Sequence, residues 1–149
     1  MKKQCFIYTE GISDRKFYQK IIDSDKFKYH TKDWEFDFKN HHGGSPEDIL
    51  QACLNKTKNK AFNKVICIID LDVIKEKYKK EYIQCCKKLE KKYAGFHILW
   101  QEDNLEGEIK KVVPKKTQKK KTSLQKIALK KIPLFVNGSL WRRLLNFFK

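Results

Sequence analysis

The chain has 149 residues, of which 40% are hydrophobic and 35% are charged. This length favours one domain, and the apolar content is high enough to fill a core, which argues against disorder. No apolar run reaches the roughly 18 residues of a membrane span, and the first residues lack the apolar stretch of a secretory signal. The five cysteines show no Cys-x-x-Cys spacing, so we expect reduced thiols, no zinc site and a cytoplasmic protein.

Charge is distributed unevenly along the chain, whose formal net charge is +16. Residues 110–149 hold 13 of the 34 basic residues and none of the 18 acidic ones. The first 109 residues therefore carry 21 basic and 18 acidic side chains, which is close to balance. A basic tract of this kind predicts a polyanionic partner, most often nucleic acid. The alternative is a solvated tail in a lysine-rich protein.

Apolar runs that suit strands alternate with amphipathic segments that suit helices. The predicted strands lie at residues 4–9, 34–38, 65–69 and 96–100. The first predicted helix begins at Ser13, and the others span residues 45–59, 74–93 and 105–113. The run VICII at 65–69 is typical of a central parallel strand that is buried on both faces, whereas WEFDF at 34–38 alternates as a half-exposed strand does.

Two of these helices carry further local signals. Ser45, Pro46 and Asp48 form the pattern of a capped helix start. The helix at 74–93 is expected to place lysines on one side and an apolar set on the other. That apolar set is Tyr78, Tyr82, Cys85, Cys86, Leu89 and Tyr93.

The pattern changes after Pro114. A polar tract containing Lys115, Lys116, Lys119, Lys120 and Lys121 precedes a weakly amphipathic helix at 124–132. A last helix begins at Ser139 and is expected to place Trp141, Leu144, Leu145 and Phe148 on one face, with Arg142 and Arg143 beside them. We predict a catalytic domain at 1–113 and a basic helical extension at 114–149. The last helix is expected to fold back on the core; the alternative is a contact with a partner protein, a membrane surface or a second copy.

The alternation predicts an α/β fold, a Rossmann-like three-layer sandwich around a mostly parallel four-stranded sheet. Ligands of such sheets bind outside the carboxyl ends of the strands. Acidic residues gather at these ends in the sequence, after the first, third and fourth predicted strands. They are Glu10, Asp70, Asp72 and the acids of residues 102–108.

The pair Asp70 and Asp72 indicates a metal site. Carboxylates this close repel one another, and burial beside a strand raises that cost unless something binds them. A hard divalent cation removes the repulsion, and Mg²⁺ favours one or two carboxylates together with substrate phosphates. The sequence therefore predicts a site for Mg²⁺ or Mn²⁺.

Three further acids are expected near this pair. Glu10 ends the first strand, Gly11 is expected to let the backbone turn sharply there, and Asp14 lies one helical turn further on. Glu106 lies at the start of the helix at 105–113. An acidic metal site on a basic protein suits phosphodiester chemistry, in which the metal activates water and lysines hold the flanking phosphates.

The same segments resemble a known family. FIYTEGISDRKFY at 6–18 resembles the opening of a Toprim domain, where a hydrophobic strand ends in Glu-Gly and Asp and a helix follow. IIDLD at 68–72 looks like the second Toprim motif, and NLE at 104–106 is similar to the Asn-x-Glu of some stand-alone and OLD-type Toprim proteins. The resemblance covers about residues 4–113, and its motifs are individually short.

The resemblance implies a metal-dependent acid cluster that acts on nucleic-acid phosphodiester bonds. Glu10 would be a metal ligand or general acid/base, Asp70 and Asp72 would be metal ligands, and Asp14 would serve a second metal. We therefore predict a Mg²⁺- or Mn²⁺-dependent nuclease of DNA or RNA. Its catalytic residues would be Glu10, Asp14, Asp70, Asp72 and Glu106. Its nucleic-acid contacts would be His42, Lys115, Lys116, Lys119, Lys120, Lys121, Arg142 and Arg143.

Two other readings of the whole chain stay open. One is a Toprim-like module that binds nucleic acid or a protein without cleaving, or a nuclease subunit that needs a separate partner. The other follows from IIDLDV at 68–73, which fits the first motif of haloacid-dehalogenase phosphatases, where the first Asp is a nucleophile. That motif normally opens its fold, whereas here two strands and two helices precede it.

The segment His41-His42-Gly43-Gly44 has two interpretations. It is either a flexible turn before the Ser45 cap or a loop that contacts substrate, because its glycines would let the backbone approach a phosphate.

Overall fold

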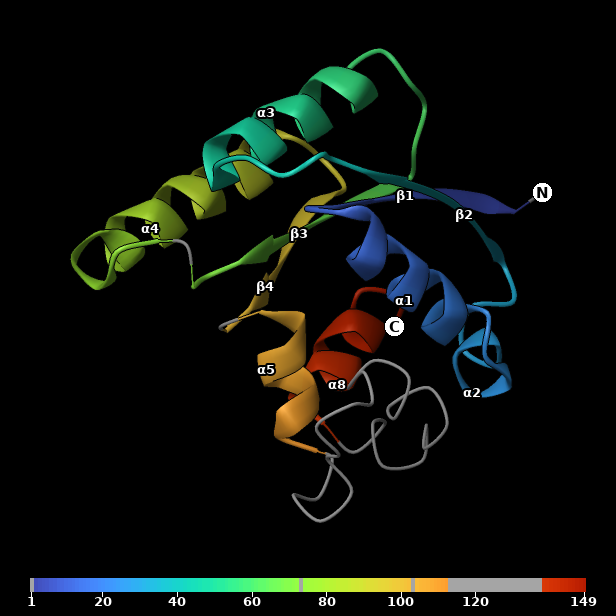
Figure 1. Ribbon diagram of the computed structural model, residues 1–149. Helices are drawn as coiled ribbons and strands as arrows, with labels where there is room; N and C mark the ends of the chain where they lie inside the picture. The colour runs from blue at the N-terminus through green and yellow to red at the C-terminus, as the bar shows by residue number, and fades with distance from the viewer. Residues whose placement is uncertain (1, 73, 103, 113–137) are drawn as a thin grey trace.

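A single parallel sheet organises the protein in the computed structural model, which describes residues 2–72, 74–102, 104–112 and 138–149 (Figure 1). The strands are β1 (Lys3–Thr9), β2 (Trp34–Asn40), β3 (Lys64–Asp70) and β4 (Phe96–Gln101). They lie in the order β2-β1-β3-β4, and all three neighbouring pairs are parallel. The predicted α/β class and the four predicted strands are confirmed.

Helices cover both faces of this sheet (Figure 1). One face carries α1 (Ile12–Ile22), α2 (Asp25–Lys28), α5 (Leu105–Lys110) and α8 (Ser139–Asn146). The other face carries α3 (Pro46–Thr57) and α4 (Glu76–Lys92). The short helix α2 is the one described helix that the sequence pattern does not predict.

Alternation along the strands divides the buried residues into two cores. Ile7, Ile66, Ile68 and Leu99 face the layer that contains α1. Their strand neighbours, among them Cys67 and Ile69, face the layer that contains α3. Strands buried on both faces in this way read as continuous apolar runs, which is why the segment at 65–69 predicts a central strand.

The amino end of α3 has the capping box that the sequence predicts. The Ser45 side chain accepts a hydrogen bond of 3.2 Å from the backbone N–H of Asp48, and the Ser45 N–H donates one of 3.4 Å to the Asp48 carboxylate. These bonds satisfy backbone donors that a helix start leaves unpaired.

The predicted apolar side of α4 is only partly buried. Cys86 is buried, while Tyr82 and Leu89 are half-buried. Tyr78 and Tyr93 are 49% and 39% exposed, and Cys85 is also exposed. The two tyrosines lie near the ends of the helix.

The last helix packs inside the domain. Leu140, Trp141, Leu144 and Leu145 on α8 are buried in the same core as Ile21 and Phe27. The prediction that this helix folds back is confirmed. The apolar side of α8 is therefore already covered in this conformation.

Other predictions fall outside the described residues. They are the helix at 124–132 and the contacts of Lys115, Lys116, Lys119, Lys120 and Lys121. Among the described helices, none is long and apolar enough to cross a membrane.

Candidate functional site

The candidate site lies at the edge of the sheet where the strands end. In chain order the last strand residues are Thr9, Asn40, Asp70 and Gln101. Carboxyl ends of parallel strands share one edge, which is where such folds bind ligands. Glu10 thus directly follows β1 and Asp70 ends β3, the two central strands.

The turn from β1 into α1 does not depend on a glycine. Gly11 has φ −146° and ψ 172°, an extended conformation that any residue adopts, and an added Cβ would meet no atom within 4 Å. The expectation that Gly11 permits a sharp turn is therefore wrong. The Thr9 hydroxyl instead shapes the turn by donating a 2.9 Å hydrogen bond to the Gly11 carbonyl. This turn places Asp14 in the first turn of α1.

Four of the five predicted acids influence one another electrostatically. Burial, followed by the charges of Glu106 and Glu10, raises the pKa of Asp14 to about 6. Burial is the main effect that raises the pKa of Asp70. The interaction with Glu10 and then the charge of Asp14 add to it, and the pKa reaches about 8. Carboxylates that crowd one another in this way favour protonation of one member of the group.

No described lysine or arginine offsets the crowding of Asp14 and Asp70. Burial and acidic side chains raise the pKa of both groups, and an interaction with the Gln101 side chain is what opposes this rise. This is notable in a chain of net charge +16. By contrast, the buried carboxylate of Glu108 is paired with Arg143 at 3.0 Å. The acidic edge therefore has the electrostatic character of a site for an external cation.

Asp72 and Glu106 border this group. Asp72 is exposed and accepts a 3.3 Å hydrogen bond from the Asn104 amide. The side-chain oxygen Oδ1 of Asn104 in turn accepts a 2.8 Å hydrogen bond from the Gly107 N–H and caps α5. This cap fixes the start of α5, which carries Glu106. The charges of Glu106 and Glu10 raise the pKa of Asp14, and those of Glu10 and Asp14 raise the pKa of Asp70; Asp72 is not among these influences.

The loop at 41–44 is tied to the same edge. His41 donates its backbone N–H to the Thr9 carbonyl at 2.9 Å, and Gly43 donates to the Glu10 carbonyl at 3.3 Å. The His41 ring lies 2.9 Å from the buried Tyr8 hydroxyl, so its role is to anchor the loop. Gly43 and Gly44 have φ of 82° and 110°, which favours glycine at both positions. His42 is exposed beside the acidic edge, and its contact with substrate stays a prediction.

The donor set suits a hard cation that takes only part of its shell from the protein. Within the described part of the chain, no three side chains of His, Cys, Asp or Glu lie close enough together to hold a metal ion on their own. Electrostatic coupling extends further than coordination, so acids can influence one another without forming a complete cage. Mg²⁺ normally uses one or two carboxylates and completes its shell with water and substrate phosphate. The crowded carboxyl groups of Glu10 and Asp70 match that requirement.

The two arginines of α8 differ in their surroundings. Arg142 is exposed, as a nucleic-acid contact would require. Arg143 points inward, where it donates to the Trp100 carbonyl and forms the ion pair with Glu108. The structure thus gives Arg143 an internal role that the sequence pattern does not predict.

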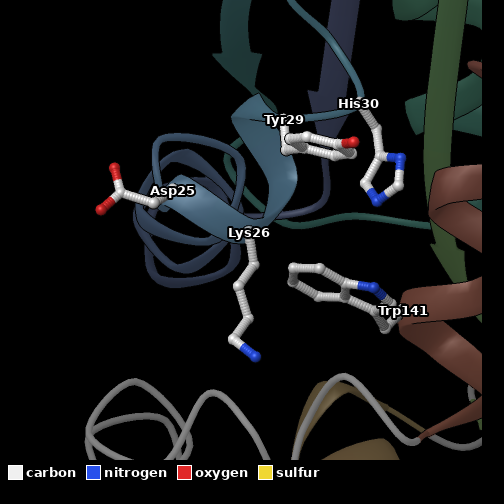
Figure 2. A pocket seen from close by; sticks show the side chains of 5 residues that line it. All are labelled: Asp25, Lys26, Tyr29, His30 and Trp141. Atoms are coloured by element: carbon white, nitrogen blue, oxygen red, sulfur yellow. The ribbon is translucent and has the colours of Figure 1, made fainter.

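A separate cavity of about 510 Å³ lies between α2 and α8. It is lined by Asp25, Lys26, Tyr29, His30 and Trp141 (Figure 2). Figure 2 shows the Asp25 carboxylate directed away from the aromatic rings. Since α2 follows the carboxyl end of α1, this cavity lies away from the acidic edge and includes none of the predicted acids.

Sequence reasoning misses two residues at the acidic edge, Gln101 and Tyr18. Gln101 is fully buried and is paired in register with Asp70. Tyr18 is 1% exposed, and its hydroxyl donates a 2.6 Å hydrogen bond to Gln101. Strand alternation contains a signal for Gln101, because it places this polar residue on the same buried face as Leu99.

Comparisons with protein-family models, curated proteins and solved structures give no match to this chain. The Toprim resemblance therefore rests on the sequence motifs.

Proposed function

We propose that this chain is a Mg²⁺- or Mn²⁺-dependent nuclease with a Rossmann-like, Toprim-like core. The observation that carries the proposal is the crowding of acids at the carboxyl edge of the sheet, where no described basic side chain offsets the raised pKa of Asp14 and Asp70. A phosphodiester substrate brings further negative charge to this edge. A divalent cation bound between the acids and the phosphate would neutralise negative charge on both.

In this proposal the acids have different roles according to their position. Glu10 and Asp70 are the first candidates to hold the cation, because Glu10 raises the pKa of Asp70 more than any other side chain does. Asp14 and Asp72 are proposed beside them. Glu106 faces Asp14 from α5 and adds to the negative potential. A bound divalent cation would neutralise the scissile phosphate and lower the pKa of the attacking water.

The lysine-rich remainder of the chain supports the choice of substrate. A formal net charge of +16 attracts polyanions over a distance of about one Debye length. Exposed basic side chains such as Arg142 would neutralise phosphates that flank the scissile bond. His42, which is exposed at the loop beside Glu10, is proposed as a further substrate contact.

A second candidate function is a Toprim-like module that binds nucleic acid or a partner protein without cleaving. The lack of a three-residue metal geometry in the described residues favours it. A nuclease subunit that completes its site with a partner belongs to the same alternative.

Cleavage of labelled single- and double-stranded DNA and RNA tests the proposal. Wild type should cleave at least one substrate with Mg²⁺ or Mn²⁺ and none with EDTA. Glu10→Gln and Asp70→Asn should lower the rate by at least about 100-fold, because each removes a proposed cation ligand. Asp25→Asn is the matched control, since this exposed carboxylate lies near the opposite edge, and it should cleave as wild type does.

Two results would contradict the proposal. Cleavage that persists at the wild-type rate in Glu10→Gln would remove the assigned roles. Salt-sensitive binding of nucleic acid with no metal-dependent cleavage of any of the four substrates would favour the binding module.

A further inference from the structure

A buried hydrogen-bonded chain lies behind the acidic edge. It starts at the Tyr18 hydroxyl on α1, passes through the Gln101 side chain at the end of β4 and ends on Asp70 of β3. Tyr18 donates to the Gln101 carbonyl oxygen Oε1 at 2.6 Å, and the Gln101 amide nitrogen Nε2 donates to Asp70 Oδ1. Tyr18 and Gln101 are 1% and 0% exposed, so water does not replace either partner.

The chemistry of the three groups fixes the direction of this chain. Gln101 Oε1 only accepts hydrogen bonds, so the Tyr18 hydroxyl must donate to it. Burial and the nearby charges of Asp14 and Asp70 raise the pKa of Tyr18 well above its ordinary value, which keeps this donor protonated. The amide nitrogen must then face Asp70. Tyr18 therefore adds a second group, besides the accepting Asp70 oxygen, that keeps the amide nitrogen directed toward Asp70.

The Gln101 side chain also influences a second carboxyl group, on another element. Burial raises the pKa of Asp14 on α1, and an interaction with Gln101 opposes that rise. Asp70 and Gln101 are register partners at the ends of adjacent strands, so the backbone holds this amide in place as well. The Gln101 side chain therefore connects β3, β4 and α1 behind the acids.

We propose that Gln101, oriented by Tyr18, is a positioning residue that holds Asp70 in the arrangement with its neighbouring acids that receives a divalent cation. This inference rests on the proposed function, because it assumes that the acids bind a cation. Carboxylates that repel one another would otherwise rotate apart, and reassembling them would lower the affinity for the cation. Hydrogen bonds that orient ligands from behind commonly contribute about 10- to 100-fold to metal affinity.

The inference is tested without measuring activity by titrating the full chain with Mn²⁺ alone. Electron paramagnetic resonance measures how much Mn²⁺ is bound. Gln101→Leu removes both hydrogen bonds at similar size and should weaken Mn²⁺ binding by about 10-fold or more. Tyr18→Phe keeps the ring and removes only the orienting donor, and a loss of about 3- to 10-fold is expected. Glu10→Gln identifies the site, since Mn²⁺ bound at the acidic edge should be lost in that variant.

Tyr82→Phe is the matched control. The Tyr82 hydroxyl is buried in the other layer and has no hydrogen-bond partner among the described residues, so its removal should leave Mn²⁺ affinity unchanged. Circular dichroism of each variant without metal checks the fold. Should Gln101→Leu fail to fold, Tyr18→Phe decides the question.

The outcomes separate the two claims. Wild type that binds no Mn²⁺ overturns the metal site of the proposed function and this inference with it. Wild type and Tyr18→Phe that bind Mn²⁺ equally well, in a way that depends on Glu10, overturn the positioning role and leave the proposed function standing. An equal loss in Tyr18→Phe and Tyr82→Phe would also overturn it.

Discussion

At the scale of single residues, Asp70 has a carboxyl group whose folded-state pKa of about 8 lies far above its ordinary value of 3.8. Between these two values the folded, metal-free protein binds more protons at this group than the unfolded chain does. Its contribution to the free energy of unfolding therefore falls as the pH rises from about 4 to 8. Asp14, with a folded pKa of about 6, acts in the same direction over a narrower range.

We expect Asp70→Asn to stabilise the metal-free protein at pH 8. The gain should be about 1 kcal/mol, after allowance for solvent screening of a partly exposed group, and it should vanish near pH 4. Urea unfolding in EDTA at both pH values measures it. Asp72→Asn, at an exposed neighbouring position, is the control and should change little. A lower stability of Asp70→Asn than of wild type at pH 8 would contradict the assigned electrostatics.

The ion pair between Glu108 and Arg143 gives a second prediction at this scale. The Glu108 side chain is 1% exposed and lies 3.0 Å from the guanidinium. Arg143→Met would leave this carboxylate buried beside the more distant Lys111, at 3.6 Å, and should lower the free energy of unfolding by about 3 kcal/mol. Arg142→Met removes an equal charge from an exposed position and should cost less than about 0.5 kcal/mol. Equal effects in a thermal or urea unfolding assay would show that Arg143 has no internal role.

At the scale of elements, α8 belongs to the core of the domain. Leu144 is 1% exposed and packs in the core with Ile21 and Leu105. Leu144→Ala should lower the free energy of unfolding by about 3 kcal/mol, because it removes buried methyl groups and leaves a cavity. Asn146→Ala, at an exposed position of the same helix, is the comparison. Urea unfolding that gives similar midpoints for both variants would contradict the packing of α8.

The sequence pattern predicts elements well where a local rule applies. The run at 65–69 predicts a buried parallel strand, and the Ser45 pattern predicts the start of α3; both are confirmed. Register and partners depend on distant residues, so strand alternation indicates that Gln101 is buried but cannot name Asp70 or Tyr18 as its partner. For the same reason the sequence pattern predicts that Arg143 is a basic surface residue, because its contact with Glu108 depends on the fold. Gly11 shows the opposite error. Its place after Glu10 suggests a sharp turn, whereas its backbone is extended.

At the scale of the whole molecule, removing the carboxyl-terminal residues is a poor test of nucleic-acid binding, because it also removes α8 from the core. Charge substitution in the full chain avoids this. Replacing Lys115, Lys116, Lys119, Lys120 and Lys121 with glutamine should weaken nucleic-acid binding. The slope of log K against log salt should become shallower by about 0.7 to 0.9 for each phosphate that the protein no longer neutralises.

A matched control removes five lysines elsewhere. Five lysines are exposed on α4, in the layer that also contains α3: Lys77, Lys80, Lys87, Lys88 and Lys91. Their replacement with glutamine makes the same change in net charge. Fluorescence anisotropy over a range of salt concentrations compares the two sets. Equal losses of affinity would show that binding depends on net charge and not on the tract at 115–121.

The all-parallel sheet also governs when the acidic edge can exist during folding. Parallel neighbours need crossover connections in place of hairpins, so every strand pair closes a long stretch of chain. Glu10 follows β1 and Asp70 ends β3. At the start of these two strands, the Gln4 N–H donates a hydrogen bond to the Asn63 side chain, 59 positions along the chain. Contacts of this separation form slowly, because chain entropy is lost before they contribute. No single helix or strand carries the whole acid cluster, so the edge is complete only when the central strands pair.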